Sequence, residues 1–163
     1  MRSLLPCFFL LLSVAAKAQF KPSVSFEQWI SLKSVGNVAI SPDGKHVLYS
    51  VNSTNWKDNT YDSEIWLSRN GEAPFQLTNT AGGSSSNARF TPDSKWISFA
   101  ADRGHKQQLY LISVDGGEAF AITQEDDGIG GYNWSPDGRK IAFTRTDPES
   151  KTEKTTKERL GAF

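Results

Sequence analysis

Three stretches of the chain alternate apolar and polar residues on both sides of one repeated phrase. The phrase is Ser-Pro-Asp-Gly at 41–44 and 135–138, and Thr-Pro-Asp-Ser at 91–94. The apolar residues recur at every second position, which is the period of a β-strand with one buried face. Each stretch therefore predicts an antiparallel hairpin. The aligned apolar positions are Val38/Ala88/Tyr132, Ile40/Phe90/Trp134, Val47/Ile97/Ile141 and Tyr49/Phe99/Phe143.

The repeated phrase has the chemistry of a type I turn that ends on a left-handed residue. Proline fixes φ, aspartate hydrogen-bonds the local backbone, and glycine adopts positive φ without strain. Ser94 replaces this glycine in the second copy, at a cost of about 1–2 kcal/mol if the geometry is kept. Because all three aspartates share one turn position, we interpret them as structural and not as catalytic or metal carboxylates. The turn residues are Pro42, Asp43, Gly44, Pro92, Asp93, Ser94, Pro136, Asp137 and Gly138.

Two further strand-like runs follow each of the first two hairpins. They lie at 64–68 and 74–78 in the first repeat, and at 108–113 and 119–123 in the second. Asn-Gly and Asp-Gly sequences join the runs of each pair, and such dipeptides between apolar runs are strong hairpin signals. Each repeat is thus expected to form four antiparallel strands, which make one β-propeller blade. The turn prolines are 50 and 44 residues apart, a period typical of such arrays.

The predicted fold is all-β, a partial β-propeller of four-stranded antiparallel blades behind a short N-terminal helix. Blades at about 37–80 and 87–124 are complete, and a third at 131–163 has only its inner hairpin. A ring needs roughly 4–8 blades of about 45 residues. We therefore expect the N-terminal piece of a longer protein, whose open blade edges favour self-association. A short natural product that completes its ring by oligomerising is the alternative.

The segments that flank the blades carry two further patterns. Residues 19–36 form a lead-in with a capping-box pattern at Ser25 and Gln28, which predicts a helix over about 26–32. This helix is expected to pack on the rim of the blades, and a helix that binds a partner is the alternative. The charged run 151–159 is expected to be an excursion between strands of the third blade.

Residues 1–18 have the layout of a secretory signal peptide. Arg2 precedes an apolar run that is too short to span a bilayer comfortably, and small residues predict cleavage between Ala18 and Gln19. A buried N-terminal helix is the alternative, disfavoured because the segment is not amphipathic. The protein is expected to be exported, to the periplasm or the extracellular space, and to leave the membrane once the signal is removed.

Charge and cysteine content limit the partners. The chain has 18 basic and 18 acidic residues; without residues 1–18 it has 16 and 18, a net charge of −2. No basic excess remains to neutralise phosphates, so nucleic acid is not an expected partner. Cys7, the only cysteine, lies in the signal segment. The mature chain is therefore expected to form neither a disulfide nor a cysteine metal site, and no cofactor is predicted.

The repeat resembles the TolB-type propeller repeat. The turn and its second strand are followed by Ile-Trp-Leu at 65–67 or Leu-Tyr-Leu at 109–111, then a glycine turn, then Gln-Leu-Thr at 76–78 or Ala-Ile-Thr at 121–123. The lead-in from Phe26 to Gly44 is similar to the mature N-terminus of exported peptidases of the prolyl oligopeptidase family, which includes dipeptidyl peptidase IV and acylaminoacyl peptidase. This resemblance implies a propeller that filters the access of peptide substrates to a C-terminal α/β-hydrolase domain with a Ser-Asp-His triad.

The chain departs from that family at the chemistry itself. It contains no Gly-x-Ser-x-Gly elbow; the stretch Gly82-Gly83-Ser84-Ser85-Ser86 lacks the second glycine. His46 is placed on a strand and His105 in a polar loop, and neither is assigned a catalytic role. The chain alone is therefore predicted to be inactive, with no catalytic, binding or metal residue assigned. The expected function is that of a serine-peptidase propeller fragment; the alternative is a fragment of a non-enzymatic TolB-like periplasmic propeller that binds proteins.

Three weaker patterns are noted. Glu125-Asp126-Asp127-Gly128 lacks the alternating ligand spacing of a calcium loop and is interpreted as a solvated inter-blade loop. Trp56-Lys57-Asp58-Asn59 is expected in a long loop at a propeller face, as a candidate contact. Asn52 and Asn133 begin glycosylation triplets, and Asn133 is expected to be inaccessible within a strand.

Overall fold

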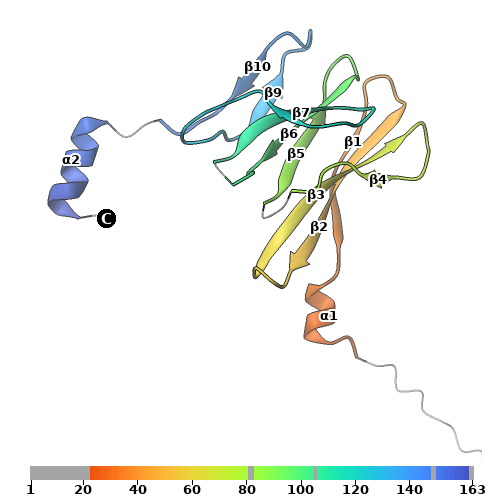
Figure 1. Cartoon of the computed structure of the whole chain (residues 1–163), viewed down its shortest axis with the longest axis horizontal. Helices are drawn as coiled ribbons and strands as arrows, with labels where there is room; N and C mark the ends of the chain where they lie inside the picture. Colours follow the sequence, from red (N-terminus) through yellow and green to blue (C-terminus); the bar gives the residue numbers. More distant parts are fainter. Residues whose placement is uncertain (1–22, 81–82, 105, 148–149, 162–163) are drawn as a thin grey trace, which may run out of the picture.

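The computed structural model describes residues 23–80, 83–104, 106–147 and 150–161. These residues form two four-stranded antiparallel sheets, one two-stranded sheet and two helices (Figure 1). Within each four-stranded sheet the strands lie side by side in sequence order. The predicted fold class, an open array of antiparallel blades, is confirmed.

Each blade is built from consecutive strands. The first contains β1 (Ser34–Ile40), β2 (His46–Asn55), β3 (Thr60–Arg69) and β4 (Phe75–Gln76). The second contains β5 (Ser85–Phe90), β6 (Trp96–Ala101), β7 (Gln108–Ser113) and β8 (Phe120–Ala121), and the third contains β9 (Tyr132–Trp134) and β10 (Ile141–Phe143).

The long loop predicted around Trp56 is wrong. Strands β2 and β3 pair along their whole length, from His46–Arg69 to Asn55–Thr60, and only residues 56–59 form the turn. The turn is held locally, because the Asn55 side-chain oxygen accepts a hydrogen bond from the Asp58 backbone N–H at 3.2 Å. Asn59 closes the turn with a φ of 52°, in the left-handed region that asparagine tolerates.

A β-bulge interrupts the first strand of both complete blades, and sequence analysis missed it. The pairing register shifts between Gly36 and Ala39 in β1, and between Ser86 and Arg89 in β5. Within these shifts Asn37 and Asn87 adopt φ values of 49° and 50°. The available signal was the asparagine at the same repeat position in two copies, since asparagine enters the left-handed region more readily than most residues.

The hydrophobic core lies between successive blades. Leu48, Ile65 and Leu67 of the first blade cluster with Ile97 and Phe99 of the second, and all five side chains are fully buried. A second cluster joins the second and third blades through Leu109, Ile129 and Tyr132. Because sheets cover the second blade on both sides, β6 is buried from Ile97 to Ala101 on both of its faces.

The aligned apolar positions are not buried in every blade, which corrects the prediction for the first one. Val38 is 66% exposed and Ile40 is 67% exposed, whereas the aligned Ala88 and Phe90 are half-buried. Ala39, between them in β1, packs against the core cluster instead. Val38 and Ile40 therefore lie on the opposite side of the strand, where no element of the described part of the chain covers them.

The helix α1 (Phe26–Ile30) has the predicted capping box. The Gln28 backbone N–H donates to the Ser25 hydroxyl oxygen at 3.1 Å, and the Ser25 N–H donates to the Gln28 side chain at 3.0 Å. The expected packing on the blade rim is wrong, because Phe26 is 67% and Trp29 is 65% exposed. The helix end is attached by polar contacts instead: the Thr54 hydroxyl donates to the Ile30 carbonyl at 2.6 Å.

The charged run near the C-terminus forms the helix α2 (Lys151–Leu160), which stands apart from the sheets in Figure 1. From its charge this run was expected to be an excursion between strands two and three of the third blade, and no helix was predicted. Lysine, glutamate, arginine and leucine are all good helix formers, and this composition favours the helix. No helix within the described residues is long and apolar enough to cross a membrane.

Candidate functional site

The three repeated turns share one hydrogen-bonding scheme. In the first, the Ser41 hydroxyl donates to Asp43 Oδ1 at 2.6 Å and accepts from the His46 N–H at 2.9 Å, while Asp43 Oδ1 also accepts from the Lys45 N–H at 3.2 Å. The same bonds recur with Thr91, Asp93, Lys95 and Trp96, and with Ser135, Asp137, Arg139 and Lys140. The fourth residues Gly44, Ser94 and Gly138 have φ values of 76°, 62° and 67°.

These contacts commit the three aspartates to the turns. The neighbouring hydroxyl donor, followed by the backbone N–H two residues on, lowers the pKa of Asp43, Asp93 and Asp137 below the usual value. Each carboxylate is therefore held ionised by its own turn. This arrangement is suited to fixing a hairpin and not to proton transfer near neutral pH.

Ser94, the exception in the repeat, also joins two blades. Its hydroxyl oxygen accepts a hydrogen bond from the Asp43 backbone N–H of the preceding turn at 3.1 Å. Gly138 occupies the equivalent place one blade further on, where an added Cβ would lie 3.5 Å from Pro92 Cδ. Successive turns thus touch one another, and Ser94 contributes a bond that glycine cannot make.

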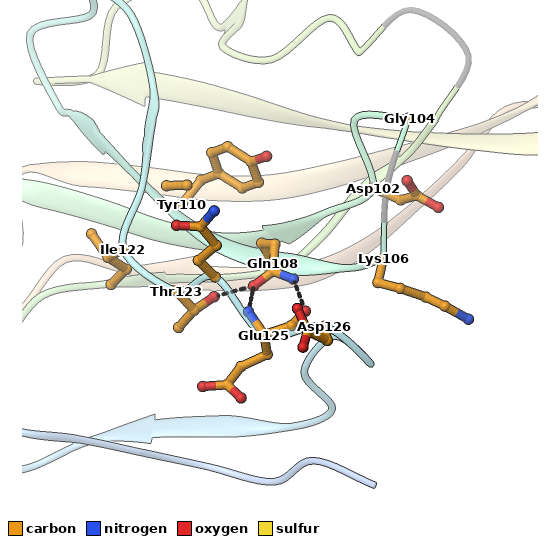
Figure 2. A pocket seen from close by; sticks show the side chains of 11 residues that line it. Asp102, Gly104, Lys106, Gln108, Tyr110, Ile122, Thr123, Glu125 and Asp126 are labelled. Carbon is orange, nitrogen blue, oxygen red and sulfur yellow. Dashed lines mark hydrogen bonds between the residues drawn. The ribbon is translucent and has the colours of Figure 1, made fainter. Parts of the chain in front are cut away.

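A groove of about 1060 Å³ lies beside the outer strands of the second blade (Figure 2). Gln108 lies at its centre, and its Oε1 accepts from the Thr123 hydroxyl at 2.8 Å and from the Glu125 N–H at 3.0 Å. Its Nε2 donates to the Glu125 carbonyl at 2.7 Å. The amide of Gln108 is therefore engaged through both its oxygen and its nitrogen in holding the chain after β8.

The same arrangement occurs in the first blade, where sequence analysis missed it. Glu64 is buried and takes the place of Gln108, accepting from the Thr78 hydroxyl and from the Thr80 N–H. The Thr78 hydroxyl oxygen in turn accepts from the Ile65 N–H at 2.9 Å. The signal was available in the threonine that ends both predicted fourth-strand runs, together with the Glu or Gln that begins the predicted third-strand runs 64–68 and 108–113.

The second and third blades meet through a buried polar contact. Ser98 is fully buried, and its Oγ lies 3.0 Å from the Tyr132 hydroxyl and accepts from Trp134 Nε1 at 2.9 Å. The Tyr132 hydroxyl also donates to the Asn87 carbonyl at 2.8 Å. Burial raises the pKa of Tyr132 to about 12, so its phenol stays neutral at physiological pH.

The acidic loop suggested as a weak calcium candidate has another use. Glu125 Oε2 pairs with Arg145 Nη1 at 2.6 Å, and Gly128 closes a turn with its N–H on the Glu125 carbonyl at 3.0 Å. A side chain at Gly128 would clash with the Gln107 carbonyl, at 2.9 Å from the added Cβ. The described residues contain no group of three or more His, Cys, Asp or Glu side chains placed to hold a metal ion.

The remaining candidates are placed as follows. An added Cβ at Gly83 would overlap the Asp102 carbonyl, and the Ser84 hydroxyl oxygen accepts from the Ser63 N–H at 3.2 Å. The His46 ring lies 6.4 Å from the Phe90 ring, and Trp56 Nε1 donates to the Ser31 hydroxyl at 3.0 Å. Asn133 lies in β9 but is exposed, so its expected inaccessibility is wrong. Ala18, Gln19, Gly82 and His105 lie outside the described residues.

Comparison with known proteins identifies the repeat. Residues 25–160 match the family model described as the TolB beta propeller domain. The chain belongs to the TolB β-propeller family. Among curated relatives of this TolB-type propeller, the uncharacterized peptidase YuxL of Bacillus subtilis is 32% identical over 129 residues, covering 76% of this chain and 19% of the relative. Dipeptidyl-peptidase 5 of Porphyromonas gingivalis is 31% identical over 120 residues, covering 73% of this chain and 17% of the relative.

Solved structures show the same fold for this TolB-type propeller. The acylaminoacyl peptidase of Pyrococcus horikoshii superposes with a TM-score of 0.61 at 17% identity, covering 75% of this chain and 19% of that one. The β-propeller domain of the trilobed protease from Pyrococcus furiosus superposes with a TM-score of 0.52 at 18% identity, covering 70% of this chain and 34% of that one. The chain is thus homologous to peptidase propellers and spans about a fifth of the curated relatives' length, which confirms the resemblance drawn from the sequence.

Proposed function

We propose that this chain supplies the first blades of a propeller that controls the access of peptides to the catalytic domain of an exported serine peptidase. The observation that carries the proposal is the 32% identity to a peptidase over 76% of the chain. The similarity to a second relative, a dipeptidyl-peptidase, has the same extent and supports the same assignment.

The polar groups of the described residues are better suited to a structural role than to a catalytic centre. A serine peptidase needs a nucleophile, a base and an orienting acid within hydrogen-bond reach of one another. Here the turn aspartates are bonded within their own turns, and Ser98 bonds Tyr132 and Trp134. In this proposal the blades select and admit peptides, and bond cleavage takes place elsewhere in the parent protein.

The test compares the 163-residue chain with the protein encoded by its uninterrupted reading frame. The long form is expected to hydrolyse dipeptidyl or acyl-peptide substrates and to carry a nucleophile elbow several hundred residues beyond Phe163. The 163-residue chain is expected to show no hydrolysis above a heat-inactivated control. A reading frame that stops soon after the ring closes would instead favour a TolB-like propeller that binds proteins, a function for which the family match provides the support.

Export is part of the proposal and has its own test. The support is the cation, apolar run and small-residue boundary within residues 1–18. Intact mass and N-terminal sequencing of the protein recovered from the periplasm or medium are expected to show Gln19 as the first residue. An intact Met1 in the cytoplasm would contradict it. Nucleic acid remains an unexpected partner, given the net charge of −2 expected without residues 1–18.

We also propose that the 163-residue chain associates with itself through the uncovered side of the first blade. Val38 and Ile40 are 66% and 67% exposed there, and exposed apolar patches on a sheet promote association. Sedimentation is expected to show less association for the Val38→Lys/Ile40→Lys variant. Val24→Lys, at a position 67% exposed outside the sheet, is the control; equal association of both variants would contradict the proposal.

A further inference from the structure

The innermost strands of the three blades carry one charged residue between them. Strands β1, β5 and β9 are the edge strands of successive sheets and lie next to one another, with β4 and β8 at the opposite edges (Figure 1). Over the three strands the single charged side chain is Arg89. The aligned residues in the other blades, Ala39 and Asn133, are neutral. A positive charge is therefore fixed at one place on the inner side of the array.

Arg89 lines a groove of about 340 Å³ between β5, β9 and β10. Its guanidinium carbon lies 5.7 Å from the centre of the Tyr132 ring, which holds the side chain by a cation–π contact. Phe143, which pairs with Tyr132 across the β9–β10 hairpin, also lines the groove and is 38% exposed. The groove thus combines a cation and an aromatic surface, and its volume lies within the range of small-ligand sites.

The charged group of this groove is available to a ligand. Within the described residues, the Arg89 guanidinium has no hydrogen bond or ion pair. The neutral Tyr132 phenol, whose pKa is raised to about 12, does not compensate the guanidinium charge. A planar guanidinium with five N–H donors matches the two oxygens of a carboxylate.

We propose that the Arg89 groove binds a carboxylate of a peptide, with the apolar neighbour of that carboxylate against Phe143 and Tyr132. The inference rests on the proposed function, since it identifies the feature of a peptide that the inner side of the propeller would recognise. A C-terminal carboxylate and a glutamate or aspartate side chain share this chemistry.

The test measures binding of three synthetic peptides to the full chain by isothermal titration calorimetry at low ionic strength. Acetyl-Ala-Ala-Phe has a C-terminal carboxylate, acetyl-Ala-Glu-Phe-amide has a side-chain carboxylate, and acetyl-Ala-Ala-Phe-amide has neither. At least one acidic peptide is expected to bind about tenfold or more tightly than the neutral one, a difference of about 1.4 kcal/mol. The preferred acidic peptide identifies the source of the carboxylate, and its advantage is expected to shrink as salt screens the charge.

Variants assign the preference to Arg89. Arg89→Gln is expected to abolish the advantage of the acidic peptide, and Arg89→Lys to reduce it severalfold, because lysine keeps the charge without the planar fork. Arg139→Gln, which removes an exposed arginine from the third turn, is the matched control and is expected to keep it. Thermal unfolding of each variant checks that the groove is still folded.

Equal affinities for the three peptides, no binding of any of them at millimolar concentration, or a preference that survives Arg89→Gln would each overturn the inference. A hydrolytically active long form without this preference would reject the inference and keep the proposed function. An Arg89-dependent preference in a protein whose long form lacks peptidase activity would support the inference and reject the proposed function.

Discussion

The first and second blades carry the same repeat, yet they differ in what covers it. In the second blade, the face of the sheet that carries Ile97 and Phe99 lies against the first blade. We call this face the leading face, and we use the same name for the aligned face of the first blade, which carries Val47 and Tyr49. Ile97 and Phe99 are fully buried, whereas Val47 is 36% exposed and Tyr49 is half-buried. The leading face of the second blade is covered by the first blade, and that of the first blade is covered by no described element.

This difference distinguishes the properties that depend on one blade alone from those that depend on contact with a neighbouring blade. Within each sheet, the cross-strand aromatic pair stacks in the same way, with ring centres 6.5 Å apart for Tyr49 and Trp66 and 5.7 Å apart for Phe99 and Tyr110. Strand pairing and aromatic stacking are thus local properties of the repeat. Burial comes from the next blade, as in other repeat arrays, where stability is shared between units and their interfaces.

Truncating the aromatic residue of each leading face gives the sharpest test of this difference. Phe99→Ala is expected to lower the free energy of unfolding by about 3–5 kcal/mol, because it leaves a cavity between two blades. Tyr49→Ala, at the aligned position, is expected to cost less than about 1.5 kcal/mol, because its side chain is already partly in water. Urea unfolding followed by tryptophan fluorescence measures both. Equal losses would mean that the first leading face is covered in solution.

The same distinction shows what the sequence made predictable. Turn positions followed from Pro42, Asp43 and their copies, because proline and glycine restrict the backbone locally. The helix cap at Ser25 and Gln28 was also predictable, because its two hydrogen bonds join residues only three positions apart. The exposure of Val38 and Ile40 was not predictable. Alternation shows which side chains share a face of the sheet, but it does not show whether another blade covers that face.

The polar contacts between residues far apart in the chain could not be predicted from the sequence either. The bond between the Asp43 N–H and Ser94 spans 51 positions, and the Tyr132–Ser98 contact spans 34. A single sequence carries no signal for such pairs, since the partners come together only when blades stack. The Arg89 groove was missed for this reason: its residues come from β5 of the second blade and from the β9–β10 hairpin of the third blade.

In the third blade, the same repeat position makes stability depend on pH. Val38 of the first blade is 66% exposed, whereas the aligned Tyr132 of the third blade is 3% exposed. A pKa of about 12 in the folded state, against about 10 in the unfolded state, means that the native protein holds the phenol proton more tightly. Stability is therefore expected to be fully present below about pH 10 and to decline by roughly 3 kcal/mol as the pH rises through about 12.

Urea unfolding at several alkaline pH values measures this decline. Tyr132→Phe is expected to remove it, at a cost of about 1 kcal/mol at neutral pH for the lost hydrogen bond. Tyr61→Phe is the control, because Tyr61 is 74% exposed and lies at the tip of a hairpin of the first blade. If the Tyr132→Phe protein loses stability over the same alkaline range as the parent, the pH dependence has another origin.

The paired networks of Glu64 and Gln108 test whether the two blades use the same contact. Glu64→Leu is expected to cost about 1–3 kcal/mol, because it leaves the Thr80 N–H and the Thr78 hydroxyl without their acceptor. Gln108→Leu is expected to have a similar effect in the second blade. Glu64→Gln should cost less than about 1 kcal/mol, since glutamine already fills this role at Gln108. Denaturation midpoints measure all three, and a Gln variant as unstable as the Leu variant would show that the first blade requires the charge.

The smallest expected effects lie at the turns, where Ser94 and Gly138 hold the same left-handed backbone. Ser94→Ala keeps that backbone and removes only the hydroxyl that accepts from the Asp43 N–H, so it is expected to cost about 0.5–1.5 kcal/mol. Ser94→Gly loses the same bond but relieves a strain of about 1–2 kcal/mol, and is expected to be near neutral. Gly138→Ala adds the strain alone, since its Cβ would meet Pro92 only at ordinary contact distance. Thermal unfolding of the three variants separates the effect of backbone strain from that of the hydrogen bond. Ser94→Ala and Ser94→Gly proteins of equal stability would show that the backbone at Ser94 is not strained.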